Sequence, residues 1–172
     1  MQAITDIKHL TVQTLPPILV LTGEDVGQFE WLKKDILKKI GYDPSDLNYS
    51  YFDMKEASYA EVELDLVSLP FFADEKIVIL DHLLDLTTAK KRNLTDEDLK
   101  QFENYLENPS ESTRLVIFAE GKLDSKRRLV KLLKRDAQII EATTPKEQDL
   151  KRYFASQAQE LGLQFVGDSL DQ

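Results

Sequence analysis

The sequence contains no cysteine, which excludes disulfides, thiol nucleophiles and thiolate metal sites. It has only two histidines, His9 and His82, and their separation argues against a histidine metal site or catalytic dyad. The longest apolar runs span about five residues, far short of a transmembrane helix. The N-terminus lacks the basic start and apolar stretch of a signal peptide. Together these absences predict a cytoplasmic protein with no membrane partner.

Basic residues are also scarce, with 22 Lys and Arg against 31 Asp and Glu, for a net charge of −9. This balance weighs against a chain that grips DNA by itself, since such binding depends on neutralised phosphates. It does not exclude an acidic subunit that handles another protein near DNA. The length of 172 residues suits one full domain and the beginning of a second.

Five short apolar runs alternate with helical patterns along the first 143 residues. Such runs are typical of buried strands in a parallel sheet, so residues 1–143 are predicted to form a three-layer α/β domain with right-handed crossovers. The predicted strands are Ile18–Leu21, Tyr49–Phe52, Ile77–Leu80, Leu115–Phe118 and Ile139–Ile140 with its flanks.

Apolar spacing near 3.6 residues predicts a helix over Val26–Ile40 that ends at Gly41. Tyr59–Val67 is a second, acidic helix. Thr95 and Asp98 resemble a capping box for a third, and Ser125 is expected to cap a fourth. The apolar stripe of the first helix is predicted to contain Val26, Phe29, Leu32, Ile36, Leu37 and Ile40, and that of the fourth Leu129, Val130, Leu132 and Leu133.

Residues 144–172 are predicted to begin a second, helical domain. Thr144 as N-cap, Pro145 in the first turn and Glu147 three residues after the cap form a strong helix start. This helix is expected to end at Gly162. The chain stops soon afterwards, so we interpret it as a fragment with a truncated second domain.

The turn after the first strand, Gly23-Glu24-Asp25, stands where a parallel α/β sheet usually binds its ligand. A phosphate-binding P-loop needs a lysine and a hydroxyl residue after its second glycine. Here two carboxylates follow Gly23, and neither residue type follows Gly27. The turn therefore has a nucleotide-binding position without nucleotide-binding chemistry, which argues against ATP hydrolysis and against a nucleotide cofactor.

The same carboxylates support an alternative function. Glu24, Asp25 and Asp81 all follow strands and would hold Mg²⁺ if they converged, as in a receiver domain or another small α/β enzyme. The receiver pattern also requires a small hydroxyl residue after the fourth strand, where Phe118-Ala119-Glu120 stands instead.

Two further surfaces can each be interpreted either as ordinary protein surface or as a binding surface. A basic cluster includes Lys126, Arg127, Lys131 and Lys134, and it forms either a solvated helix face or a docking surface for DNA phosphates or an acidic partner. Trp31 lies off the apolar stripe of its helix. A generic adaptor would use Trp31 or this basic cluster.

Two adjacent phenylalanines, Phe71 and Phe72, follow Leu69 and Pro70 just before the third predicted strand. Neighbouring side chains on an extended backbone point to opposite faces, so one core does not easily bury both rings. Either one ring joins the core while the other covers the sheet edge, or the pair anchors another protein.

Three stretches together resemble the delta subunit family of the bacterial DNA polymerase III clamp loader. They are Val20–Asp25, Leu69–Leu80 and Lys122–Lys131, in the same order and with similar spacing as in the family. The resemblance runs over nearly the whole chain.

The resemblance implies an AAA+-like domain that has lost its P-loop, followed by the start of a lid domain. A collar domain that joins the other clamp-loader subunits would be missing. It implies a non-catalytic replication protein that binds the sliding clamp and opens its ring or holds it open, and that contacts DNA only weakly or indirectly. The family's clamp-binding motif corresponds to Leu69, Pro70, Phe71 and Phe72.

Overall fold

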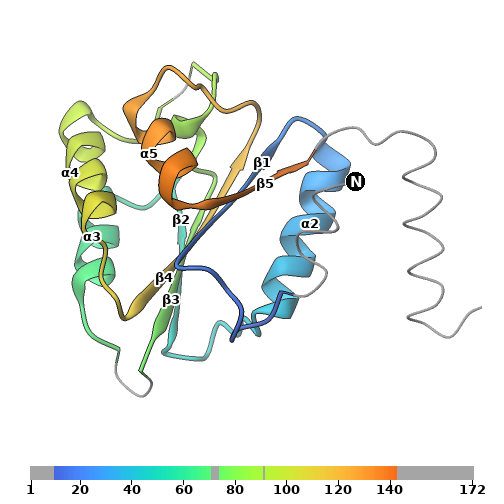
Figure 1. Cartoon of the computed structure of the whole chain (residues 1–172), viewed down its shortest axis with the longest axis vertical. Coiled ribbons are helices and arrows are strands. Elements are labelled where there is room, and N and C mark those ends of the chain that lie inside the picture. Colours follow the sequence, from blue (N-terminus) through green and yellow to red (C-terminus); the bar gives the residue numbers. More distant parts are fainter. Residues whose placement is uncertain (1–9, 71–73, 91, 143–172) are drawn as a thin grey trace, which may run out of the picture.

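The computed structural model describes residues 10–70, 74–90 and 92–142. A parallel five-stranded sheet in the order β2-β3-β4-β1-β5 forms its centre (Figure 1). The strands are β1 (Ile18–Gly23), β2 (Tyr49–Asp53), β3 (Lys76–Asp81), β4 (Thr113–Glu120) and β5 (Gln138–Ala142). The predicted α/β sheet, with all five of its strands, is confirmed.

Helices cover both faces of this sheet, as Figure 1 shows. One face packs against α2 (Val26–Lys39), and the other packs against α3 (Tyr59–Val67), α4 (Asp96–Glu107) and α5 (Arg128–Asp136). A short 3₁₀ turn, η1 (Leu84–Leu86), follows β3. No helix in the described part of the chain combines the length and apolar character needed to cross a bilayer.

The central strands are apolar on both sides because both sides are covered. In β1, Ile18 and Val20 face the core under α3, α4 and α5, while Leu19 and Leu21 face the core under α2. All four are at most 3% exposed. Strand neighbours alternate between faces, so a short continuous apolar run fills two cores at once.

The helices begin largely where their capping residues predict. Thr95 and Asp98 form the expected capping box at the start of α4, and Gly41 adopts a φ of 72° just beyond the end of α2. The predicted inner face of α5 is buried, whereas its predicted cap is wrong. Residues 124–127 form a turn first, with the Arg127 amide donating to the Asp124 carbonyl at 3.1 Å. The helix therefore begins at Arg128, and Ser125 instead accepts a hydrogen bond from Lys134 at 2.6 Å.

Val26 is a second correction, because it was expected in the buried stripe of α2 and is 59% exposed. It occupies the first position of the helix, where the chain is still leaving β1 at the carboxyl edge of the sheet. The buried stripe begins one turn later, at Phe29.

Among the described glycines, Gly23 leaves the least room for a side chain. Its φ is 127°, a conformation that side chains rarely adopt, and a Cβ atom there would overlap the backbone of Ala142. Its amide and carbonyl also pair with Gly121, at 2.9 and 2.7 Å. Strands β1, β4 and β5 therefore meet at this residue.

We expect Gly23→Ala to lower the free energy of unfolding by at least about 2 kcal/mol, because it adds both backbone strain and overlap. Gly27→Ala is the matched control, since Gly27 lies inside α2 and a Cβ atom added there would lie 3.6 Å from its nearest neighbour, Asp25 Oδ1. It should match or slightly exceed the wild type in stability. Urea unfolding followed by circular dichroism measures both. Equal midpoints for the two variants would contradict this account of the turn.

Candidate functional site

Two edges of the sheet present the residues that the sequence singles out. The carboxyl edge holds the Gly23-Glu24-Asp25 turn, and the amino edge holds the segment that runs from α3 into β3. Since the helices cover both faces, the strands themselves are open to a ligand at these edges rather than on the faces.

At the carboxyl edge, the turn between β1 and α2 contains only Glu24 and Asp25. Asp25 is the N-cap of α2, and its Oδ1 accepts a hydrogen bond from the Gln28 amide at 2.9 Å. An amide that a bound phosphate would use at a helix N-terminus is thus already taken by a carboxylate.

An open hollow of about 380 Å³ lies beside this turn. Its charged lining consists of Glu24, Glu120 and Lys122, so carboxylates outnumber the single lysine. The remaining lining residues are Thr87, Thr88, Ala89 and Gly121. A polyphosphate would meet net negative charge here.

Asp81 does not join Glu24 and Asp25 in a metal site. It is 2% exposed and forms an ion pair with Lys33 of α2 at 2.5 Å. The Tyr51 hydroxyl donates to Asp81 Oδ2, and the His82 amide donates to Oδ1 at 2.8 Å. Burial, reinforced by Asp81, raises the pKa of Tyr51 well above its usual range. Within the described residues, no group of three acidic or histidine side chains is placed to hold a metal ion.

The polar cluster around Asp81 was not predicted from sequence. Lys33 also lies 5.7 Å from the ring centre of Phe118, so its ammonium group contacts both a carboxylate and an aromatic face. This contact joins α2 to Asp81 at the end of β3 and to Phe118 in β4, which is a structural role.

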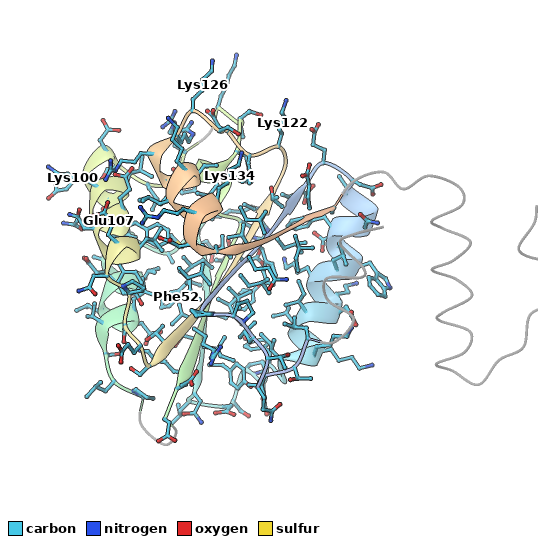
Figure 2. All side chains as sticks on the ribbon, viewed as in Figure 1. Phe52, Lys100, Glu107, Lys122, Lys126 and Lys134 are labelled. Atoms are coloured by element: carbon cyan, nitrogen blue, oxygen red, sulfur yellow. The ribbon has the colours of Figure 1, made fainter. Side chains whose placement is uncertain are left out.

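The proposed basic face is only partly available. Arg127 pairs with Asp124 at 3.4 Å, and Lys134 donates to Ser125. Lys126 and Lys131 are exposed. Figure 2 shows Lys122 and Lys126 extending outward at the top of the molecule, whereas Lys134 lies lower, along α5. The cluster is therefore divided between a loop and a helix.

At the amino edge, Leu69 is 77% exposed, the largest exposure among the large hydrophobic side chains of the described residues. Pro70, which follows it, is half-buried. Phe71 and Phe72 lie outside the described residues. The segment leaves the end of α3 and enters β3, on the side of the sheet opposite the Gly23 turn (Figure 1).

Lys76 links the two ends of this segment. Although charged, it is only 5% exposed. Its ammonium group donates to the Asp65 backbone carbonyl in the last turn of α3, to Asp65 Oδ1 at 3.0 Å and to the Ser68 hydroxyl at 2.6 Å. A cation at a helix C-terminus also interacts favourably with the helix dipole. The start and the end of the segment are thus tied together by one buried lysine.

A second tie lies beside the first. Arg114 of β4 makes a two-pronged hydrogen-bonded ion pair with Glu75, the residue just before Lys76. The Arg114 guanidinium holds the pKa of the Glu75 carboxyl below its usual value. Glu75 therefore turns toward β4, and both residues that end the segment are anchored to the body of the domain.

The comparisons with known proteins first define a class. The fold matches the solved structure of a DNA clamp loader delta protein from Bacillus subtilis with a TM-score of 0.72 and 23% identity, over 92% of this chain and 47% of that chain. It also matches a DNA polymerase III gamma subunit-related protein from Thermotoga maritima with a TM-score of 0.52 and 16% identity, over 89% and 50% of the two chains. The domain thus has the AAA+-like fold of clamp-loader subunits.

Sequence comparison narrows the class to one family. The family model described as DNA polymerase III, delta subunit matches residues 19–143. DNA polymerase III subunit delta of Bacillus subtilis is 30% identical over 137 residues, which cover 78% of this chain and 40% of that protein. The chain belongs to the DNA polymerase III delta subunit family, and it spans less than half the length of the curated relative it matches.

We expect Lys76→Met to lower the free energy of unfolding by about 1–3 kcal/mol, because it keeps the side-chain length but leaves buried acceptors without a donor. Lys38→Met, at an exposed position in the last turn of α2, is the control and should stay within about 0.5 kcal/mol of the wild type. Thermal melts of both variants provide the test. If Lys76→Met has the same melting temperature as the Lys38→Met control, Lys76 does not stabilise this segment.

Proposed function

We propose that this chain is a non-catalytic clamp-loader subunit that binds the sliding clamp and opens its ring or holds it open during DNA replication. The exposure of Leu69 is the single observation that carries the proposal. A leucine that is 77% exposed, directly before Pro70 and two phenylalanines, suits an apolar plug for a pocket on a partner. Membership of the delta subunit family favours the clamp as that partner.

The attachment of both ends of the segment to the domain supports the same proposal. Lys76 and Arg114 fix where the chain leaves α3 and where it enters β3. A segment held at both ends loses less conformational entropy on binding than a free one, so more of the contact energy remains as affinity. The plug would then be presented from a rigid domain.

Ring opening needs no catalytic group in this chain. A subunit that binds the open ring better than the closed ring shifts the equilibrium by its differential affinity for the two forms. The capped turn at Asp25 and the carboxylates around it support a subunit that neither binds nor hydrolyses ATP.

Contacts with other clamp-loader subunits and with DNA are part of the proposal. The net charge of −9 favours weak or indirect DNA contact, with Lys126 and Lys131 as the exposed basic side chains available for it. We infer that the rest of the clamp loader supplies the ATP-dependent steps and most of the phosphate contacts.

We expect Phe71→Ala combined with Phe72→Ala to weaken binding to the sliding clamp at least about 100-fold, since two hot-spot side chains would be lost. The circular dichroism spectrum and melting temperature should stay close to those of the wild type. Surface plasmon resonance on immobilised clamp measures the affinity.

Trp31→Ala is the control, because Trp31 is an aromatic side chain that is 38% exposed on α2. It should leave clamp affinity unchanged. Loss of binding in this variant alone would favour an adaptor that acts through α2. Unfolding of the double phenylalanine variant would instead assign the two rings to the core.

A further inference from the structure

Helix α3 has two apolar faces, although one is sufficient to hold it on the sheet. Its inner face consists of Tyr59, Val62 and Leu66, all at most 3% exposed. The outer face bears Ala60 and two larger residues, Leu64 and Val67, at spacings of four and three. This spacing aligns the three side chains in one stripe along the helix.

The outer stripe is exposed to solvent. Leu64 is 72% exposed and Val67 is 58% exposed. Leu69, two residues beyond the end of the helix, is 77% exposed. These residues are three of the eight exposed large hydrophobic side chains in the described parts of the chain, and they lie within six positions. Single exposed apolar residues are ordinary, but a periodic group of this kind is typical of an interaction surface.

We propose that this outer stripe of α3 is a second part of the clamp contact, packed against the clamp when the Leu69–Phe72 plug enters its pocket. The proposal rests on the proposed function above. Leu69, the first residue of the plug, follows Val67 by two positions, so a clamp surface that covers the plug lies next to the stripe.

The last turn of α3 is also fixed relative to the strands β3 and β4. The Lys76 ammonium joins the last turn of α3 to the start of β3, and the Thr113 hydroxyl of β4 donates to the Leu66 carbonyl at 3.1 Å. The chain positions on either side of the plug therefore keep a fixed place relative to α3.

Interface area supplies an independent argument. A stable specific interface buries roughly 800 Å² on each partner. Two phenylalanine rings account for roughly 300–500 Å² of that area. The remainder requires further contact surface next to the plug, and the outer stripe of α3 offers exposed apolar area there.

The test uses a double variant that carries both Leu64→Gln and Val67→Gln, called the stripe variant. Its control is the single variant Val26→Gln. Val26 is 59% exposed in the first turn of α2, almost the same as Val67, but it lies at the opposite edge of the sheet. We expect the stripe variant to bind the sliding clamp about tenfold more weakly, chiefly through faster dissociation. The Val26 variant should bind within about twofold of the wild type.

Three results overturn the inference, and only the second of them also overturns the proposed function. If the stripe variant binds like the wild type while the double phenylalanine variant does not, the stripe contact is wrong and the function stands. If both variants bind like the wild type, the proposed function is wrong as well. If sedimentation shows a wild-type dimer that only the stripe variant loses, with clamp affinity unchanged, the stripe binds a second copy of this chain instead.

Discussion

Burial of the parallel sheet on both faces constrains everything else in this structure. Helix α2 covers one face and α3, α4 and α5 cover the other, so the strands can be apolar throughout. With both faces covered, a partner meets the loops at the two edges or the outer sides of the helices. The function of the chain therefore depends on which of these surfaces is apolar and exposed.

The two edges are built differently. At the carboxyl edge, Gly23 pairs with Gly121 and leaves no space for a side chain against Ala142, while Asp25 caps α2. At the amino edge, a segment with an exposed leucine is tied at its base by a buried lysine. The turn at the carboxyl edge is a structural joint, and the opposite edge carries the exposed Leu69.

The sequence predicts the strands and most helices well, because continuous apolar runs and capping residues are local signals. It fails where the contact is distant in sequence or where a helix starts late. Lys76 looks like an exposed strand end, yet it reaches back to Asp65 and Ser68. Asp81 looks like a metal ligand among the acidic residues, but Lys33 neutralises it from a helix more than 40 residues earlier. The one local signal of such pairing is in β3, where the charged residues Lys76 and Asp81 stand at the two ends of an otherwise apolar strand.

We propose that this domain binds its partner through its amino edge. Hydrogen–deuterium exchange of the backbone amides, with and without the sliding clamp, tests it most directly. The account predicts slower exchange in the presence of the clamp across residues 59–76, from α3 into β3, and no change across residues 21–28. Protection confined to residues 21–28 or to the neighbouring carboxyl-edge loop at residues 120–127 would contradict it.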